Sequence, residues 1–395
     1  MKILMITPYL PYPLVSGGQI RTYNLLKNLS PKHEITLVSF IRNIAEKKYL
    51  PNLEKYCIGV HPVIRRSAWS AKNIILAGFS HLPFLMAIYY SFTAKEIINR
   101  LLDEEKFDLI HAETFYVMPN IPKTKIPILL VEQTIEYLVY DHFVKTTPKF
   151  LRPILAWDVT KIKFWEKHYW GKAAKVIAMS PQDAAKMKQL VKNLNFGIIP
   201  NGVDSNFFSK ISIAKTQTLT VLFVGNFKWL QNREAAEFLI SQVFPKIKRQ
   251  VTKAKLLVVG KNPSQRLLDL SKKYQDVVID TNVDDIRIAY RKADVLVAPI
   301  FGPGGTRYKI LEAAASAIPV VTTPAGIEGI PAVDKTHLLL GNTAEELATA
   351  AVKLLADKKF SDKIAQNGKN LVIENFDWKK ISQKLDKVYR EVANV

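Results

Sequence analysis

Short apolar runs, each followed by a polar segment with breakers, recur along the chain of 395 residues. Each run is long enough for one buried strand and too short for a buried helix. Charged or amphipathic stretches separate most of the runs, so the pattern predicts strands alternating with helices, and therefore an α/β chain with parallel sheets. The runs are 2–7, 35–40, 59–64, 108–112, 126–131 and 175–179 in the first half, and 219–224, 256–259, 277–279, 295–298 and 320–323 in the second.

The clearest unit of this kind lies at residues 295–324. A buried strand at 295–298 is followed by a loop rich in Gly and Pro, a helix from Tyr308 to Ala317, and a second strand that begins after Pro319. Ligands of open parallel sheets bind beyond the carboxyl ends of the strands, where such loops lie. This loop is therefore the first place to look for chemistry.

Candidate binding groups gather in that loop and in the first helical turn. Gly304 and Gly305 allow backbone N–H groups to approach an anion, and a helix N-terminus adds partial positive charge. Arg307 and Lys309 add formal charge, and Glu312, one turn further, is placed to accept hydrogen bonds from hydroxyl groups. Phosphate beside a hydroxyl-bearing ring describes a nucleotide or nucleotide-sugar. By themselves, a Gly-Gly turn and a solvated glutamate are the alternative interpretation.

The same run resembles the donor-binding motif of family 4 glycosyltransferases, which have the GT-B fold. In that family one Glu precedes a second by eight positions, and Ala and Pro-Val-Val follow the second. Here Glu312 holds the second position and is followed by Ala313 and by 319–321, while Gly304 stands at the first, as in Gly-rich versions that resemble GGTRxKxxEA. The run Ile-Pro-Asn-Gly-Val-Asp at 199–204 is a second match, at the place where the family closes its first domain.

The resemblance covers almost the whole chain and implies two Rossmann-like domains that face each other across a cleft. We expect an acceptor domain at 1–204, a nucleotide-sugar donor domain at 205–377, and a helix at 378–395 that crosses back to the first domain. The implied activity is a retaining glycosyltransferase with a UDP- or GDP-linked donor and a glycan or lipid-linked acceptor, in bacterial cell-surface polysaccharide or glycolipid biosynthesis. Neither a metal ion nor a separate cofactor is implied.

Two further loops are expected to contact the donor. The Gly17–Gly18 loop after the first strand matches a Gly-Gly loop of the family, although a plain turn before a helix explains it equally well. In the loop after 219–224 the family commonly has Gly-Arg and then a Lys, whereas this chain has Asn226 and Gln231. Positive charge must then come from other side chains, and the candidates are Lys228, Arg233, Arg307 and Lys309.

The predicted donor-binding residues are Gly17, Gly18, Gly225, Asn226, Lys228, Gly304, Gly305, Thr306, Arg307, Lys309 and Glu312. Arg307 and Lys309 are also predicted to be catalytic, because they would hold the leaving diphosphate as its charge develops. A third catalytic candidate is Glu136. It follows the strand at 126–131, where many family members carry a His near the reacting sugar, and this chain has Glu132, Gln133 and Glu136 instead.

The net charge of +21 predicts an anionic partner. The charge is spread along the chain and no nucleic-acid-binding motif accompanies it, which favours a membrane surface over nucleic acid. Residues 65–92 combine a basic start with an apolar, aromatic run, a composition typical of an interfacial segment; a pair of core helices is the equal alternative. The single cysteine, Cys57, fits a reducing compartment. We expect a cytoplasmic protein, peripheral at the inner face of the plasma membrane.

Three other functions compete with this hypothesis. A nucleotide-sugar epimerase of the same architecture would convert the donor without an acceptor. A non-catalytic partner subunit is suggested by Gly304, Asn226 and Gln231, which stand where the family usually carries charged residues. A nucleic-acid binder is suggested by charge alone. The pair Asp284–Asp285 is interpreted as a helix cap, because no His or third carboxylate accompanies it as a metal site would require.

Overall fold

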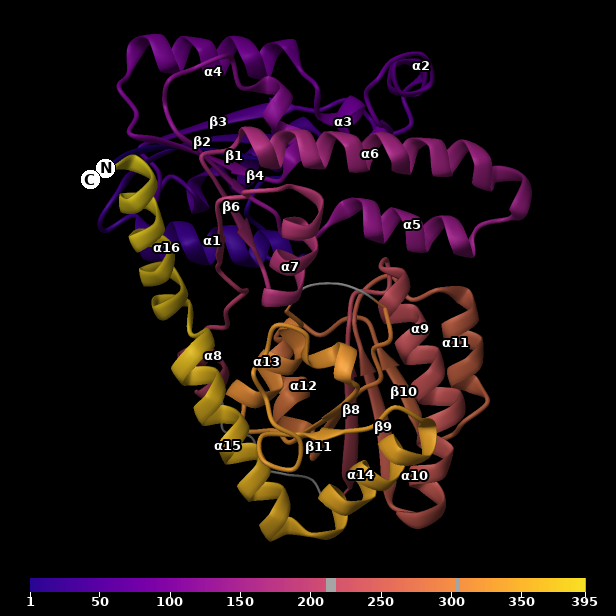
Figure 1. Ribbon diagram of the computed structural model, residues 1–395. Coiled ribbons are helices and arrows are strands. Elements are labelled where there is room, and N and C mark those ends of the chain that lie inside the picture. The colour runs from indigo at the N-terminus through magenta and orange to yellow at the C-terminus, as the bar shows by residue number, and fades with distance from the viewer. Residues whose placement is uncertain (211–217, 303–305, 395) are drawn as a thin grey trace. The chain divides into compact units, whose positions relative to one another are not determined.

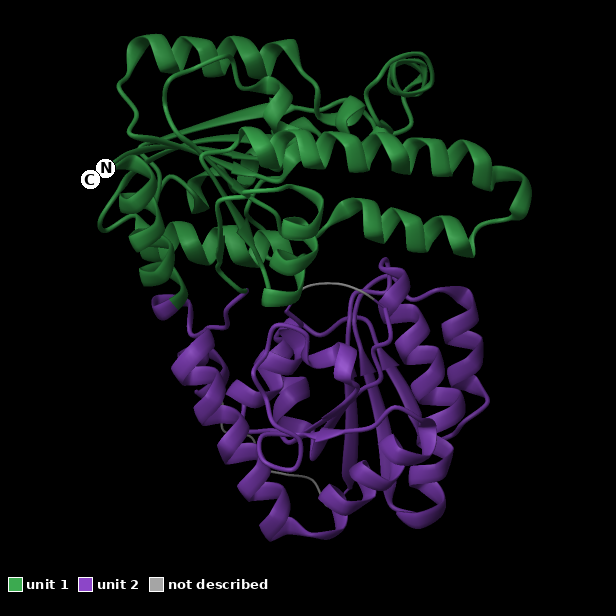
Figure 2. Ribbon diagram, in the orientation of Figure 1, with its two compact units in different colours: residues 1–200, 381–395 green, residues 201–380 purple. Residues whose placement is uncertain are grey.

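The computed structural model describes residues 1–210, 218–302 and 306–394. The chain forms two compact units: unit 1 comprises Met1–Pro200 with Ile381–Val395, and unit 2 comprises Asn201–Lys380 (Figure 2). Each unit is described by itself. The polar stretch 209–218, which the sequence indicates as a linker, lies mostly outside the described residues.

Unit 1 is built on a sheet of seven parallel strands in the order β3-β2-β1-β4-β5-β6-β7 (Figure 1). Its strands are β1 (Lys2–Thr7), β2 (Glu34–Ile41), β3 (Gly59–Ile64), β4 (Leu109–Glu113), β5 (Ile128–Val131), β6 (Lys175–Ala178) and β7 (Phe196–Ile198). Its α-helices are α1 (Gly17–Leu29), α2 (Ala71–Phe79), α3 (Phe84–Tyr89), α4 (Phe92–Glu104), α5 (Glu136–Thr146), α6 (Arg152–Lys172) and α7 (Pro181–Leu190). Short 3-10 helices are η1 (Ile44–Asn52), η2 (Phe115–Asn120) and η3 (Lys149–Leu151).

The central strands of this sheet are buried on both faces because helices cover both, so they consist of continuous apolar runs. Helix starts follow ordinary capping chemistry. The Ser16 side chain accepts a hydrogen bond at the start of α1, and Ser180 does the same for α7, with Pro181 as the first helical residue. The charged stretch after β2, expected to be helical, forms the 3-10 helix η1 with Pro51 inside it.

Unit 2 is built on a second parallel sheet, in the order β10-β9-β8-β11-β12-β13. Its strands are β8 (Leu219–Val224), β9 (Ala254–Val259), β10 (Val277–Asp280), β11 (Val295–Ala298), β12 (Val320–Thr322) and β13 (Leu339–Leu340). Its helices are α8 (Ser205–Ser209), α9 (Leu230–Phe238), α10 (Phe244–Gln250), α11 (Gln265–Lys272), α12 (Ile286–Lys292), α13 (Tyr308–Ala315), α14 (Ala344–Ala356) and α15 (Lys358–Phe376). A π-helical turn, η4 (Leu239–Val243), joins α9 to α10, and η5 (Pro324–Ile327) is a 3-10 helix.

The last helix, α16 (Trp378–Ala393), begins in unit 2, and its residues from Ile381 onward belong to unit 1. Fully buried Tyr389 fixes it to the first sheet, because its hydroxyl lies 2.5 Å from His111 Nδ1 on β4. Asp386, one turn earlier, forms ion pairs with Lys32 and His33 in the loop before β2. The C-terminal segment thus packs on the same unit as the N-terminal strand.

Candidate functional site

The loop after β11 and helix α13 lie at the centre of the second sheet. β11 pairs with β8 on one side and with β12 on the other, and α13 begins beyond the carboxyl end of β11. Pro319 precedes β12, so the predicted strand–loop–helix–strand unit is confirmed. The glycines of the predicted motif, Gly304 and Gly305, lie outside the described residues.

Lys309 is held inside this unit rather than in solvent. Its side chain is buried, its Nζ donates a hydrogen bond to Asn232 Oδ1 at 2.7 Å, and it lies over the Phe223 ring, 4.2 Å from the ring centroid. Burial and the neighbouring Arg307 together lower the pKa of Lys309 to about 7, although the Glu312 carboxylate opposes the shift. An anion bound here would relieve the repulsion between the two cations, so the surroundings of Lys309 are suited to a negatively charged group.

Glu312 points toward the protein and not into bulk water. Its Oε2 accepts a hydrogen bond from the hydroxyl of Tyr290 on α12 at 2.7 Å. Tyr290 itself is fully buried. Burial raises the pKa of Glu312, while the hydrogen bond from Tyr290 and the charge of Lys309 lower it. A carboxylate held by one donor retains further acceptor capacity, which two hydroxyl groups of a sugar ring can use. Glu312 is half-buried and held by Tyr290, which favours the binding interpretation over a solvated helix charge; its contact with a donor stays a prediction.

Arg307 precedes the first residue of α13, and its guanidinium donates a hydrogen bond to the Gly302 carbonyl at 2.8 Å. The contact turns the arginine side chain back toward Gly302, the last described residue after β11. Thr306, beside it, is buried, and its backbone carbonyl accepts a hydrogen bond from the Asn201 side chain. Two of the predicted donor-binding residues, Arg307 and Lys309, are thus placed at one helix start.

The loop after β8 meets this helix through Asn232. The Asn232 side chain donates to the Asn226 carbonyl at 2.9 Å and accepts from Lys309. Gly225 permits this contact, because a Cβ there would lie 2.9 Å from the Asn232 side chain. Gly260 is more constrained, since it has φ +154° and its Cβ would overlap the Gly225 carbonyl oxygen. Lys228, also predicted to bind the donor, is exposed on this loop.

The sequence did not single out Tyr290 or Asn232. Tyr290 lies in a helix of ordinary composition, and its partner Glu312 is 22 residues away. Asn232 immediately follows Gln231, the position at which a lysine was expected from the resemblance. Its role emerges only because α13 brings Lys309 to the same place. No local pattern identifies either residue.

In unit 1, the predicted Gly17–Gly18 loop forms the first turn of α1. A Cβ on Gly18 would collide with the Tyr9 hydroxyl and would lie 2.7 Å from Gln133 Oε1. Gln133 also donates a hydrogen bond to Tyr9 and another to Glu113 Oε2, the latter at 2.7 Å. Glycine at position 18 is therefore required by packing against a buried polar network, whether or not the loop contacts a ligand.

Glu136, the third catalytic candidate, begins helix α5, after β5. Burial raises its pKa to about 7. Its backbone N–H donates to Glu166 Oε1 at 2.6 Å, and the neighbouring Glu132 accepts a hydrogen bond from Trp170 at 2.9 Å. Burial, together with the neighbouring carboxylates, raises the pKa of Glu132 and Glu166 well above the ordinary value. A pKa near 7 suits a group that exchanges a proton at neutral pH, but the catalytic role of Glu136 stays a prediction.

His111 on β4 is fully buried and lies between Tyr389 and Glu113. Its two ring nitrogens contact groups from α16 and β4, so the residue secures the C-terminal helix. Asp285 caps α12 and forms a close ion pair with Arg287, as the interpretation of 284–285 as a helix cap predicts. Within the described ranges, no group of three or more His, Cys, Asp or Glu is arranged to hold a metal ion.

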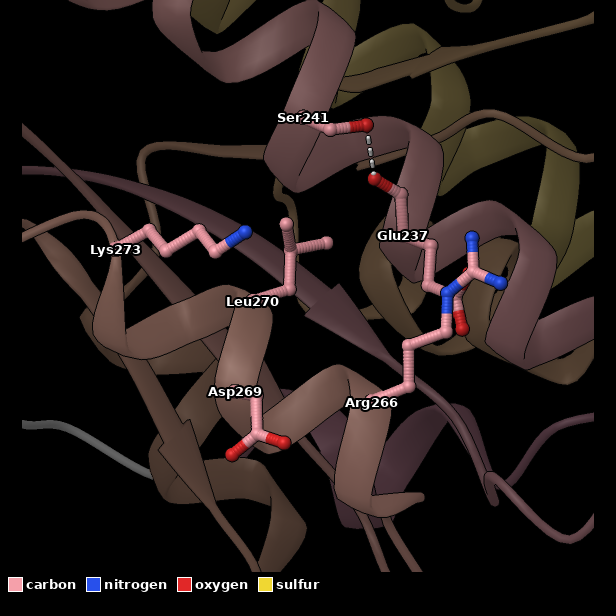
Figure 3. Close-up of a pocket in the computed structure, with 6 residues that line it drawn as sticks. All are labelled: Glu237, Ser241, Arg266, Asp269, Leu270 and Lys273. Atoms are coloured by element: carbon pink, nitrogen blue, oxygen red, sulfur yellow. Dashed lines mark hydrogen bonds and ion pairs between the residues drawn. The ribbon is translucent and has the colours of Figure 1, made fainter.

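A pocket of about 510 Å³ lies elsewhere in unit 2, between α9, η4 and α11 (Figure 3). Its lining residues are Glu237, Ser241, Arg266, Asp269, Leu270 and Lys273. Opposite charges compensate one another there; Arg266, for example, pairs with Glu237 at 3.1 Å. No predicted donor-binding residue lines this pocket, so it does not define the site.

Comparisons with known proteins agree with this geometry. A model described as Glycosyltransferase Family 4 matches residues 15–207, and a model described as Glycosyl transferases group 1 matches residues 218–357. An uncharacterized 44.6 kDa protein in the cps region of Klebsiella pneumoniae is 19% identical over 96% of this chain and 97% of its own length. The two family models fall on the two sheets described above.

Solved structures share the fold. Sucrose-phosphate synthase from Thermosynechococcus elongatus superposes with a TM-score of 0.77 at 19% identity, covering 99% of both chains. The Anabaena protein HepE, in complex with UDP and glucose, gives a TM-score of 0.68 at 16% identity, covering 99% of this chain and 100% of its own. Both relatives have two Rossmann-like domains of the GT-B type.

The fold and the matched families define the class: a GT-B glycosyltransferase. More specifically, the chain belongs to the family 4 glycosyltransferases, and its second half matches the model described as group 1. The predicted fold class is confirmed.

Proposed function

We propose that this protein is a retaining glycosyltransferase that takes a sugar from a UDP- or GDP-linked donor and transfers it to a glycan or lipid-linked acceptor. The observation that carries the proposal is the environment of Lys309. A buried amine with a lowered pKa lies beside Arg307 at the start of a helix, one turn before Glu312. Cations and a helix N-terminus together attract a diphosphate.

The reaction breaks the bond between the anomeric carbon of the sugar and the diphosphate oxygen. A new bond forms between that carbon and the acceptor oxygen on the same face, and the acceptor proton passes to the departing phosphate. Negative charge grows on the leaving diphosphate as the first bond breaks. Lys309 and Arg307 stabilise this charge more in the transition state than in the bound donor, which lowers the barrier.

Glu312 orients the nucleotide. Tyr290 fixes one carboxylate oxygen, so the carboxylate can accept hydrogen bonds from two ribose hydroxyls without losing its orientation. Asn232 has the same effect on Lys309, because its Oδ1 holds the ammonium group in place. Lys309 and Glu312 are therefore each held in place by a neighbouring polar side chain, as a precise site requires.

The proposed setting is bacterial cell-surface polysaccharide or glycolipid synthesis. It is supported by the similarity over nearly the full length to a protein in the cps region of Klebsiella pneumoniae. A UDP-linked donor is supported by the fold shared with HepE, whose structure contains UDP and glucose. We also propose a cytoplasmic location at the inner face of the plasma membrane, with residues 65–92 in contact with anionic lipid; these residues carry three cations and no acidic residue. No described helix is long and apolar enough to cross a bilayer.

A thermal-shift screen against UDP-, GDP- and ADP-sugars tests the proposal. A ligand that binds the folded state raises the melting temperature in proportion to the logarithm of its concentration above its dissociation constant. We expect one UDP- or GDP-linked sugar to do so. Absence of any shift with the whole panel would favour the non-catalytic subunit.

Product analysis then separates the remaining alternatives. Incubation with the binding donor alone must leave its sugar unchanged; conversion to another sugar nucleotide would identify an epimerase. With acceptor present, nuclear magnetic resonance of the product must show the donor's anomeric configuration. An inverted product would contradict the retaining mechanism while leaving the glycosyltransferase assignment intact.

A further inference from the structure

Residues 65–92 contain two helices with opposite exposure. Helix α3 is core, since Leu85, Met86 and Ala87 are buried. Helix α2 buries only Asn73 and exposes its apolar residues to solvent. Ile75 is 58% exposed and Phe79 is 92% exposed. Burial of large apolar side chains is favourable, so this much exposed apolar surface on one short helix marks an interaction site.

Helix α6 exposes a second apolar row of the same kind. Ile154 is 72% exposed, Trp157 is 64% exposed and Phe164 is 61% exposed. These residues are three and seven positions apart, so they share one side of the helix.

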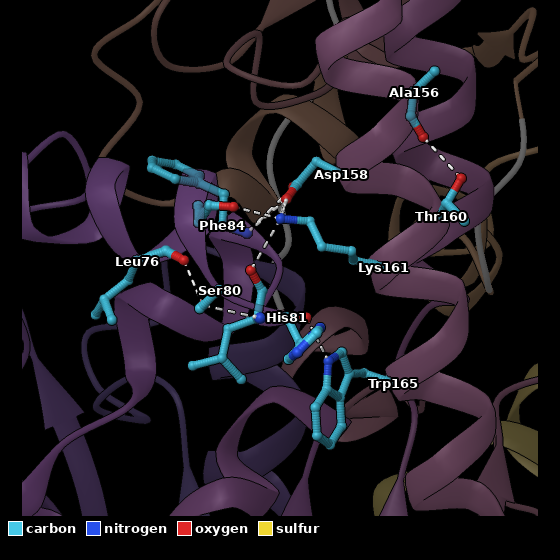
Figure 4. A network of polar contacts seen from close by, with 11 residues as sticks. Leu76, Ser80, His81, Phe84, Ala156, Asp158, Thr160, Lys161 and Trp165 are labelled. Atoms are coloured by element: carbon cyan, nitrogen blue, oxygen red, sulfur yellow. Dashed lines mark hydrogen bonds and ion pairs between the residues drawn. The ribbon is translucent and has the colours of Figure 1, made fainter.

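Polar contacts join α6 to the segment of α2 and α3 (Figure 4). Lys161 donates to the carbonyls of Ala77 and Leu82, Asp158 accepts from the Phe84 N–H at 3.0 Å, and Trp165 donates to the His81 carbonyl at 2.8 Å. Asp158 and Trp165 come directly after the exposed residues Trp157 and Phe164. The side of α6 that contacts the α2–α3 segment is therefore next to the side that carries the exposed apolar residues. These contacts therefore hold the two elements together as one body, and each element carries exposed apolar side chains.

The charge around this body is positive. Residues 65–92 contain Arg65, Arg66 and Lys72 and no acidic residue. Helix α6 carries five Lys or Arg and only two acids. Of these acids, Asp158 accepts a hydrogen bond from the Phe84 N–H and pairs with Lys161. Glu166 is fully buried and accepts hydrogen bonds from the backbone N–H groups of Glu136 and Tyr137. Aromatic side chains flanked by cations match the interface of an anionic bilayer, where rings lie at headgroup depth and cations meet phosphates.

We propose that the exposed sides of α2 and α6 form one docking surface for an anionic phospholipid bilayer. This aromatic–basic face is made by Trp69, Ile75, Phe79, Ile154, Trp157 and Phe164. This proposal rests on the proposed function and adds the place where the membrane binds. The docking surface would bring a lipid-linked acceptor to the enzyme. Binding to the bilayer itself requires neither donor nor acceptor, so it is tested separately from catalysis.

The test is flotation of the full-length protein with vesicles of phosphatidylcholine, with and without phosphatidylglycerol. Wild type should float with the anionic vesicles and far less with the neutral ones. The double variant Phe79→Ser/Trp157→Ser should lose roughly tenfold or more of its partition into anionic vesicles. Its melting temperature and its donor-induced thermal shift should equal those of wild type, because no residue of the donor site changes.

A matched pair of single variants controls for the loss of any exposed isoleucine. Ile75 on α2 and Ile58, just before β3, are 58% and 57% exposed. Ile58 precedes β3 whereas the 65–92 segment follows it, so the two positions lie at opposite ends of that strand. Ile75→Ser should weaken flotation and Ile58→Ser should not.

Three results would overturn the proposal: no flotation of wild type with either vesicle, equal flotation of wild type and the double variant, or a dimer in sedimentation that the double variant dissociates. The last result would assign the face to a second copy of the chain. If the protein binds the donor but does not float, only the docking surface is refuted. If it floats but binds no nucleotide-sugar, only the proposed function is refuted.

Discussion

In unit 2, Lys309 and Glu312 lie one turn apart on α13, each held by a neutral partner, Asn232 or Tyr290. In unit 1, the carboxyl groups of Glu132, Glu136 and Glu166 lie close together around the start of α5. Burial shifts the pKa values in both places toward the neutral form, down for Lys309 and up for Glu132, Glu136 and Glu166.

The difference lies in what would restore the charge. An anion beside Lys309 and Arg307 would raise the pKa of Lys309 and be held by it, so this cluster is built to respond to a ligand. The carboxyl cluster of unit 1 responds to protons instead, because each carboxyl group that stays protonated relieves its neighbours. The two clusters thus differ in what would compensate their charge: an anion at Lys309 and Arg307, and protons at the carboxyl groups of unit 1.

Removal of the carboxylate at the donor cluster should have the largest effect. Glu312→Ala should reduce transfer by roughly 100-fold or more, because the ribose loses its acceptor and the diphosphate is no longer aligned. The initial rate with a saturating acceptor measures the effect, and an unchanged melting temperature shows that the protein remains folded. Turnover like that of wild type would refute the site.

The pH dependence of donor binding should distinguish the two clusters next. The pKa of free Lys309 is about 7, and a bound diphosphate raises it, so binding takes up a proton above pH 7. Affinity should be constant below pH 7 and should fall by at most about tenfold per pH unit above it. A nucleotide-sugar is the right probe, since its diphosphate does not titrate in this range. Lys309→Gln should bind weakly and without this dependence; a pH-dependent variant would contradict the assignment.

Glu136→Gln addresses the carboxyl cluster. The folded-state pKa of Glu136, about 7, lies above its ordinary value of 4.5, so its contribution to stability is present below pH 4.5 and is lost as pH rises through 7. The amide cannot ionise, and the variant should gain no more than about 3 kcal/mol over wild type at pH 8. Thermal unfolding at pH 5 and pH 8 measures this gain. If Glu136 is also catalytic, transfer should fall while stability rises; full activity would remove it from the mechanism.

Tyr290→Phe should have the smallest effect on the donor cluster. The substitution keeps the ring in place and removes one hydrogen bond to the Glu312 carboxylate. Donor affinity should fall about tenfold, the value of a hydrogen bond to a charged group. Calorimetric titration measures it. An affinity equal to that of wild type would show that Glu312 needs no support from α12.

The strands and α13 were predictable because buried parallel strands are continuous apolar runs and because Gly and Pro mark the ends of elements. The exposure of 65–92 was not predictable, since apolar periodicity alone does not say which of two apolar helices meets the core; the structure buries α3 and exposes α2.

Contacts between residues that are far apart in the chain could not be predicted from the sequence, for a similar reason. His111 contacts Tyr389, 278 positions away, and only the return of α16 to unit 1 brings the two together. The Lys309–Asn232 contact likewise depends on the first turns of α13 and α9, which are far apart in the sequence. The motif predicted Lys309 and Glu312 as site residues, and only the packing shows the side chains that hold them.

Calorimetric titration of the nucleotide-sugar found in the screen into two double variants tests the central claim most directly. Arg307→Ala/Lys309→Ala removes two cations from the start of α13, and Arg266→Ala/Lys273→Ala removes two from the pocket between α9 and α11. At about pH 6 Lys309, with its pKa of about 7, is mostly charged, so both variants lower the net charge nearly equally and long-range attraction falls alike in the two. We predict that the first loses donor binding and that the second binds as wild type does. Equal affinities for the two variants, or loss only in the second, would contradict the account.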